Sequence, residues 1–179
     1  VAVDPSLFCG DCYFCKTNRG NHCLNWNGYG VTLNGAFADY VLVPSRNVYP
    51  IGDLSFEEAA FIEPISCVVY GLRRLKVKTG EEVLIFGSGP IGLLLMQLIK
   101  HGGAAKVVVT DLKEKRLKIA ESLGAHATVV ADASQEKKLK DIAPLGFDVV
   151  IDATGVPKVV EGMFNYIKPT GKILSLIHI

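Results

Sequence analysis

Four cysteines near the start of the chain have the spacing of a metal site. Cys9, Cys12, Cys15 and Cys23 follow the pattern C-x2-C-x2-C-x7-C. Four thiolates can surround a zinc ion tetrahedrally at about 2.3 Å, and such a set leaves no open position for a substrate. We therefore predict a structural zinc lobe, in which the ion holds its loop together and takes no part in catalysis.

Other interpretations of these cysteines stay open. They could form disulfides or remain free thiols, and His22 could replace one of them as a ligand. A zinc ribbon that binds nucleic acid would need flanking basic side chains, and only Lys16 and Arg19 lie nearby. The fifth cysteine, Cys67, falls in a predicted apolar helix, and we expect it to pack in the core.

A glycine-rich segment further along the chain matches the dinucleotide fingerprint G-x-G-x-x-G. It lies between a predicted strand and a predicted helix, in the order Gly87, Ser88, Gly89, Pro90, Ile91 and Gly92. Gly87 allows the tight turn, Gly89 lets backbone amides approach a pyrophosphate, and Gly92 permits close packing of helix on strand. The positive end of the helix dipole lies at the same point. A turn that binds no ligand is the alternative.

Asp111 ends the next predicted strand, nineteen residues after the last fingerprint glycine. A carboxylate there accepts hydrogen bonds from the adenosine ribose and repels a 2′-phosphate, so we predict NAD and not NADP. Asp111 could also cap the next helix, with Glu114 completing a capping box. Arg116 is a weaker candidate for the adenine side. Thr154 follows the fourth strand and either lines the cofactor cleft or only makes a turn.

The pattern of apolar residues predicts the elements that position these groups. Beyond residue 82, short apolar runs alternate with amphipathic stretches, which predicts strands at 83–86, 106–110, 127–130, 147–151 and 172–176 and helices at 90–102, 113–123, 134–143 and 156–166. Strands that are apolar throughout are buried on both faces, so we expect a doubly wound parallel sheet.

The first part of the chain is predicted to consist of short strands and loops. We expect strands at 1–3 and 36–43, a capping box at 55–58, and a helix from Pro64 to Leu75. The predicted domains are residues 1–62 with the zinc lobe, a connecting helix at 63–80, and a nucleotide-binding domain at 81–179.

Composition limits the class of protein. The chain has 179 residues, 49% of them hydrophobic, and a net charge of +1, so it can fold around a core and has no basic excess for nucleic acid. It has neither an apolar run of membrane-spanning length nor a signal peptide, so we expect a cytoplasmic protein. The chain lacks an initiator Met, and both ends fall in predicted strands. We therefore expect an internal fragment.

Taken together, these motifs resemble the zinc-dependent medium-chain alcohol dehydrogenases. The matching features are the segment at 1–5, the four cysteines, the segment at 35–40, Glu63-Pro64, the glycine fingerprint with Asp111, and the segment at 152–155. The resemblance implies an α/β protein. Part of a GroES-like, β-rich catalytic domain would carry the zinc lobe and would be followed by a truncated Rossmann sheet. Residues 175–179 fit the family poorly.

The family resemblance also implies a reaction. Members use a second, catalytic zinc that polarises the substrate oxygen while hydride passes to the nicotinamide. Two ligands of that zinc, a Cys and a His, are expected upstream of residue 1. The third resembles Glu63 in the sorbitol and polyol branch. From the residues alone, an acidic group before a helix is favoured by the dipole and needs no metal.

The resemblance therefore implies oxidation of a secondary hydroxyl on a polyol or sugar alcohol with NAD+ as acceptor. The alternatives are a simple alcohol or threonine dehydrogenase, or a non-catalytic relative that binds the nucleotide. Zinc-free quinone and enoyl reductases generally lack the cysteine lobe. A homo-oligomer, dimer or tetramer, is also implied, with no nucleic-acid or membrane partner.

Overall fold

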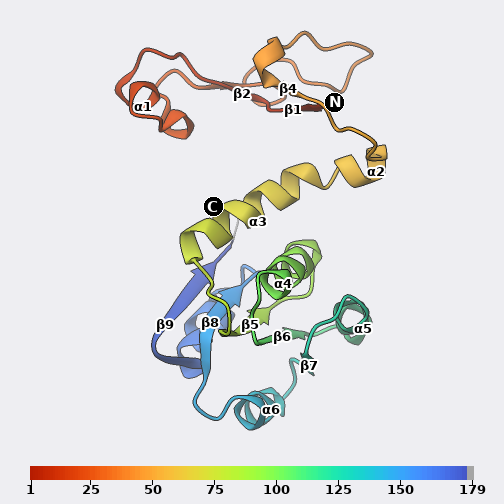
Figure 1. Cartoon of the computed structure of the whole chain (residues 1–179), viewed down its shortest axis with the longest axis vertical. Helices are drawn as coiled ribbons and strands as arrows, with labels where there is room; N and C mark the ends of the chain where they lie inside the picture. Colours follow the sequence, from red (N-terminus) through yellow and green to blue (C-terminus); the bar gives the residue numbers. More distant parts are fainter. Residues whose placement is uncertain (177–179) are drawn as a thin grey trace. The chain divides into compact units, whose positions relative to one another are not determined.

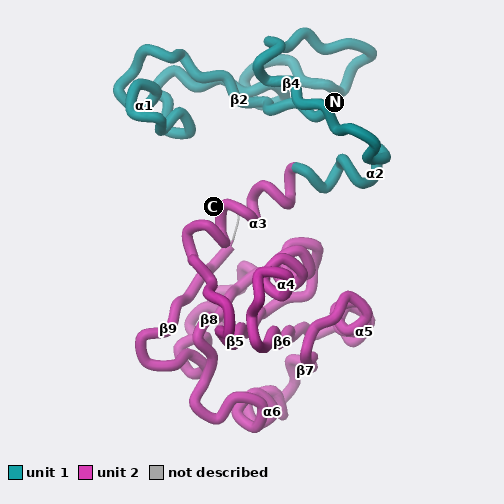
Figure 2. The backbone as a smooth tube through the Cα atoms, viewed as in Figure 1, with its two compact units in different colours: residues 1–62 teal, residues 63–179 magenta. Residues whose placement is uncertain are grey.

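A computed structural model describes residues 1–176 of the chain. The chain divides into two compact units, residues 1–62 and 63–179 (Figure 2). Residues 177–179, the last part of the segment that fits the family poorly, lie outside the described residues. Among the residues described, no helix combines the length and the apolar character needed to cross a bilayer.

Unit 1, residues 1–62, contains only short elements. They are β1 (Ala2–Val3), β2 (Ser6–Leu7), α1 (Tyr13–Lys16), the 3₁₀ turn η1 (Gly20–His22), β3 (Asn27–Gly28), the 3₁₀ turn η2 (Ser45–Asn47), β4 (Val48–Tyr49) and α2 (Phe56–Ala59). Two antiparallel pairs form, β1 with β4 and β2 with β3. The buried side-chain amide of Asn47 ties them together, because it donates to the carbonyls of Asp4 and Ser6, each at 2.8 Å.

One predicted strand of unit 1 is wrong and one predicted cap is confirmed. Residues 36–43 form no strand, and Phe37, Tyr40 and Leu42 are exposed. A strand needs a hydrogen-bonding neighbour and a buried face, and the described residues supply neither at this segment. The capping box exists: the Ser55 side chain accepts from the Glu58 N–H, and the Glu58 carboxylate accepts from the Ser55 N–H.

Unit 2, residues 63–179, is built around a five-stranded parallel sheet in the order β7-β6-β5-β8-β9. Its elements are α3 (Ile62–Leu75), β5 (Glu82–Phe86), α4 (Pro90–His101), β6 (Lys106–Asp111), α5 (Glu114–Ser122), β7 (Ala127–Val130), α6 (Gln135–Ile142), β8 (Phe147–Asp152), α7 (Pro157–Gly162), the 3₁₀ turn η3 (Met163–Asn165) and β9 (Ile167–Ser175). The predicted doubly wound sheet is confirmed.

Alternate residues of each strand face the two sides of the sheet and enter two separate cores. Val83 and Ile85 pack with Val68 of α3 and with Leu95 and Met96 of α4, whereas Leu84 and Phe86 pack with Leu139 of α6. Figure 1 shows α3 and α4 on one side of the sheet and α6 on the other. Full burial of one such side chain stabilises the fold by about 1.5–3 kcal/mol.

Three predicted boundaries differ from the structure. The helix predicted at 156–166 ends at Gly162 and continues as η3. Strand β9 begins at Ile167, five residues before its predicted start, and it carries an irregularity where Thr170 adopts φ +68°. Helix α3 begins at Ile62, two residues before Pro64. Pro64 has no N–H to lose and fits the first turn of a helix.

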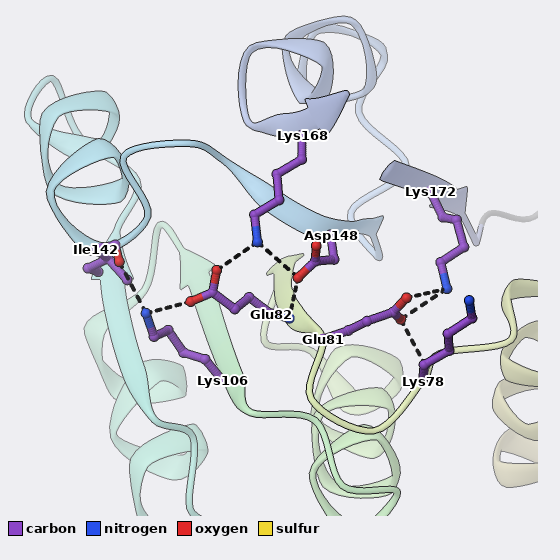
Figure 3. Close-up of polar contacts among 8 residues, drawn as sticks. All are labelled: Lys78, Glu81, Glu82, Lys106, Ile142, Asp148, Lys168 and Lys172. Atoms are coloured by element: carbon purple, nitrogen blue, oxygen red, sulfur yellow. Dashed lines mark hydrogen bonds and ion pairs between the residues drawn. The ribbon is translucent and has the colours of Figure 1, made fainter. Parts of the chain in front are cut away.

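A cluster of ion pairs crosses the amino-terminal edge of the sheet (Figure 3). Lys168 Nζ of β9 lies 2.9 Å from Glu82 Oε2 of β5 and 3.0 Å from Asp148 Oδ2 of β8, and Lys106 Nζ of β6 lies 2.8 Å from Glu82 Oε1. We call these four residues the basal ion cluster. It joins four neighbouring strands at the edge opposite the fingerprint turn.

A second contact of the same edge fixes the end of α3. Lys172 Nζ of β9 donates to the carbonyl of Lys76, directly after α3, at 2.8 Å and lies 2.9 Å from the Glu81 carboxylate. A Cβ added at Gly71 of α3 would lie 3.4 Å from Cδ2 of Leu174 in β9 and 2.9 Å from Cδ1 of Leu176, the residue directly after β9. The last turns of α3 are thus held against β9.

Candidate functional site

The four predicted zinc ligands come together in unit 1. Their Sγ atoms all lie within 4.8 Å of one another, and the closest, those of Cys9 with Cys23 and of Cys12 with Cys15, are 3.5 Å apart. Tetrahedral zinc with Zn–S bonds of about 2.3 Å sets sulfurs about 3.8 Å apart, whereas a disulfide needs about 2.05 Å. The cluster therefore fits a zinc ion and contains no disulfide.

The backbone of the lobe also favours thiolates. The N–H of Cys9 donates to Cys23 Sγ and that of Cys12 to Cys9 Sγ, each at 3.4 Å. Backbone hydrogen bonds lower the pKa of Cys12 to about 6, whereas burial raises the pKa of Cys15 to about 12. A bound cation would remove this conflict by stabilising all four anions. His22 lies outside the group, its ring centroid 5.7 Å from that of Phe14.

The fingerprint turn has the geometry that its glycines predict. Gly87 adopts φ +100°, and an added Cβ would lie 3.0 Å from the Ala153 carbonyl oxygen. A Cβ on Gly92 would overlap the Gly87 carbonyl oxygen. Gly89 differs, because its Cβ would meet no atom within 4 Å, so only a ligand requires a glycine there. Pro90 begins α4, and no side chain caps the free N–H groups of its first turn.

Asp111 is fixed beside this turn at the end of β6. Its Oδ2 accepts from the Ser88 N–H at 2.9 Å, and its Oδ1 accepts from the Lys113 N–H at 2.8 Å. Arg116 Nη1 lies 3.8 Å from Oδ2. Burial opposes ionisation of Asp111, yet these N–H donors and the guanidinium outweigh it and lower its pKa. Helix α5 has no side-chain cap, so the capping box with Glu114 does not form.

Thr154 lies on the other side of the fingerprint turn, after β8. Its hydroxyl donates to Asp152 Oδ1 at 2.6 Å and its Oγ1 accepts from the Val156 N–H at 3.1 Å. Asp152 is fully buried and also accepts from Ser175 Oγ at 3.0 Å. Because the hydroxyl proton of Thr154 is committed to Asp152, its oxygen can only accept a hydrogen bond from a ligand.

A cavity of 750 Å³ connects these groups, which is the size range of cofactor sites. Gly87, Gly89, Asp111, Arg116 and Thr154 line it, as the sequence predicts, whereas three other predicted contacts do not: Pro90, Ile91 and Gly92. Ile91 packs against the core instead.

Part of the cavity wall consists of residues that the fingerprint motif does not predict. The additional lining residues come from the β7–α6 connection and from the α7 region, and they include Ala131, Gln135, Val156, Lys158 and Tyr166. Only the general rule that ligands lie beyond the carboxyl ends of parallel strands could have indicated them. A larger hollow of 1120 Å³ borders residues 29–42 of unit 1, but no charged side chain lines it.

Glu63 lies exposed in the first turn of α3, where the helix dipole favours a carboxylate. The prediction that Cys67 packs in the core is wrong, because Cys67 is exposed. The buried face of α3 contains Val68, Gly71 and Leu75 at helical spacing, and Cys67 points away from it. Its Sγ donates to Glu63 Oε1 at 3.6 Å. Desolvation and then the charge of Glu63 raise the pKa of Cys67, so the thiol keeps its proton.

Two family models match separate parts of the chain. The alcohol dehydrogenase GroES-like domain matches residues 1–53, and the zinc-binding dehydrogenase domain matches residues 90–176. Both were implied by the resemblance seen in the sequence.

Individual proteins are similar over nearly the whole chain. D-arabinitol dehydrogenase 1 of Uromyces fabae is 39% identical over 97% of this chain and 51% of its own length. L-threonine 3-dehydrogenase of Stenotrophomonas maltophilia is 39% identical over 98% of this chain and 52% of its own. The chain thus spans about half the length of the curated relatives it matches.

A solved structure agrees with these relatives. A protein of Sinorhizobium meliloti described as a zinc-binding dehydrogenase bound to NADP matches with a TM-score of 0.86 at 34% identity, over 98% of this chain and 53% of its own. The two family models match in the order in which the family carries these domains, and the relatives and the cysteine cluster agree with them. The chain belongs to the zinc-dependent medium-chain alcohol dehydrogenase family.

Proposed function

We propose that the protein containing this chain oxidises a secondary hydroxyl of a polyol or sugar alcohol and passes the hydride to NAD+. The observation that carries the proposal is the ionised Asp111, which two backbone N–H groups hold in a cavity beside the fingerprint turn. Both carboxylate oxygens keep a free lone pair for ribose hydroxyls. A 2′-phosphate at the same place would be repelled, which favours NAD over NADP.

Each candidate residue has a separate task in this proposal. The N–H groups at the start of α4 bind the pyrophosphate, and Thr154 Oγ1 accepts a hydrogen bond from the cofactor. Gly87, Gly89, Asp111, Arg116 and Thr154 are assigned to cofactor binding from the cavity wall, whereas Pro90, Ile91 and Gly92, which do not line the cavity, are assigned only because they form the first turn of α4. When bound, NAD supplies the hydride acceptor and a catalytic zinc supplies a Lewis acid. Glu63 would hold that zinc, directly or through water, and the four-cysteine lobe would hold a structural zinc.

The substrate class depends on Glu63-Pro64 and on the relatives. Glu63 resembles the third zinc ligand of the polyol branch, and one relative is named a D-arabinitol dehydrogenase. A threonine or simple-alcohol substrate is the second candidate, because a threonine dehydrogenase is equally similar at 39% identity. A non-catalytic relative would keep the cavity but would lack the catalytic ligands.

The organisation of the protein is part of the proposal. Residues 1–62 belong to the catalytic domain, 63–80 form the connecting helix, and 81–179 form the NAD-binding domain. We place the protein in the cytoplasm, where reduced cysteines bind metal more often than they pair. We expect a homo-oligomer, dimer or tetramer.

The test follows NADH formation by the whole protein with polyols, simple alcohols and threonine, each with and without a zinc chelator. Chelator-sensitive oxidation of a polyol supports the proposal. Turnover of threonine or ethanol alone would keep the family and overturn the substrate class. Glu63→Gln should remove activity while Glu57→Gln, an exposed acidic control in α2, should not.

A further inference from the structure

The cofactor cavity runs along the carboxyl edge of three neighbouring strands. The fingerprint turn follows β5, Asp111 ends β6, and Ala131 follows β7, the next strand outward in the sheet. A dinucleotide with its pyrophosphate at the turn and its ribose at Asp111 therefore directs its base toward Ala131. Gln135, the first residue of α6, forms part of the cavity wall at this end.

The side chain of Gln135 is held in place by the sheet. Its Nε2 lies 3.2 Å from Oγ1 of Thr110, which is buried on β6 directly before Asp111. One of the two hydrogens on Nε2 is thereby used, and Oε1 is the acceptor of the side chain. Within residues 1–176, no donor is paired with this oxygen. A half-buried carbonyl oxygen gains from a hydrogen bond that a ligand can supply.

The rest of this recess suits a flat, apolar ring. Ala131 comes from the β7–α6 connection, and Val156 and Val159 come from the α7 region, so small and branched side chains form part of the wall of the cavity that Gln135 also lines. An aromatic base would bury its faces on these side chains and present its edge to a polar group. Gln135 is positioned to recognise that edge.

We propose that Gln135 selects the base of the cofactor, with Oε1 accepting a hydrogen bond from the exocyclic amino group of adenine. A 6-oxopurine would bring a carbonyl oxygen against Oε1, and two acceptors repel each other. The inference rests on the proposed function, because it requires a nicotinamide dinucleotide in the cavity. It adds a specificity residue that the fingerprint motif does not contain.

The test compares the binding of NADH and of reduced nicotinamide hypoxanthine dinucleotide, which carries a 6-oxo group in place of the amino group. Dissociation constants are measured by cofactor fluorescence on the purified whole protein. One hydrogen bond corresponds to about tenfold in affinity, so the wild type should prefer NADH by about tenfold. Gln135→Leu should reduce that preference to within about twofold, chiefly because it weakens the binding of NADH.

Two further variants separate base selection from general damage. Gln135→Glu keeps an acceptor and should keep the preference for NADH. Gln97→Leu removes a matched amide of α4, which donates to the Leu93 carbonyl and does not line the cavity, and should change neither constant. An unchanged preference in Gln135→Leu, or a wild type that prefers the hypoxanthine cofactor, would overturn the inference alone. Failure of the wild type to bind either cofactor would overturn the proposed function as well.

Discussion

Replacing Lys168 by Met should destabilise unit 2 by about 1–2 kcal/mol at pH 7. Lys168 Nζ bridges Glu82 and Asp148 at 2.9 and 3.0 Å, and these side chains are only 26–32% exposed. Pairs at a surface contribute about 0.2–1 kcal/mol each. The substitution also leaves two carboxylates of adjacent strands without the cation between them, which adds a repulsion of similar size.

The destabilisation caused by Lys168→Met should also depend on pH. Hydrogen bonds from Lys106 and Lys168 lower the pKa of Glu82. Burial opposes ionisation of Asp148, but the Glu82 N–H and Lys168 outweigh it and lower its pKa too. Carboxyls with lowered pKa values stabilise the fold above their ordinary range near pH 4, and this contribution is lost as the pH falls below it. The cost of Lys168→Met should therefore be full at pH 7 and smaller near pH 3.

Urea unfolding followed by circular dichroism measures the effect. All helices from α3 to α7 lie in residues 62–162, so the helical signal reports mainly on unit 2. The urea midpoint should fall by roughly 1 M. Lys137→Met, an exposed α6 position without an ion pair among the described residues, is the control, and Lys168→Arg should restore most of the loss. A penalty that is equal at pH 7 and pH 3 would refute the electrostatic reasoning and leave only lost packing.

Three further predictions concern the metal and the cofactor. Dialysed protein should retain about one zinc on the lobe, and Cys12→Ser should lose it; metal analysis that finds equal zinc in both would contradict the four-thiolate site. Asp111→Ala should weaken the binding of NADH by about tenfold or more. It should strengthen the binding of NADPH, because it frees the guanidinium of Arg116, which lies 3.8 Å from the carboxylate. An unchanged ratio of the two dissociation constants would contradict this. Gly92→Ala should lower the melting temperature, because its Cβ overlaps the Gly87 carbonyl oxygen, whereas Gly89→Ala should melt normally and bind NADH more weakly.

The sequence predicted those features whose cause is local. Residues 83–86 of β5 and 107–109 of β6 are all apolar, so the burial of these segments on both faces could be predicted directly. The cysteine spacing and the fingerprint turn also depend on neighbouring residues. Cys67 was misplaced because an amphipathic pattern does not distinguish the edge of a helix face from its centre.

Contacts between residues far apart in the chain could not be predicted, because they leave no local pattern in the sequence. Lys168 and Glu82 are 86 residues apart and meet only because β9 and β5 both flank β8. Gln135 reaches Thr110 across 25 residues and joins the cavity only after α6 packs on the sheet. The false strand at residues 36–43 has the same origin, because alternating apolar residues do not by themselves supply a neighbour.

Helix α3 is held in place at its middle and its carboxyl end, so the position of Glu63 near its amino end depends on contacts elsewhere in the helix. Val68 and Gly71 pack into unit 2 and Lys172 holds the carboxyl end of the helix, while Glu63 lies about 7.5 Å beyond Val68 at 1.5 Å per residue. A tilt of about 8° about Val68 would displace the backbone of Glu63 by about 1 Å, enough to spoil the geometry proposed for its carboxylate as a metal ligand. Crowding at Gly71 or loss of the Lys172 contact would thus be felt as misalignment at a carboxylate that neither residue touches.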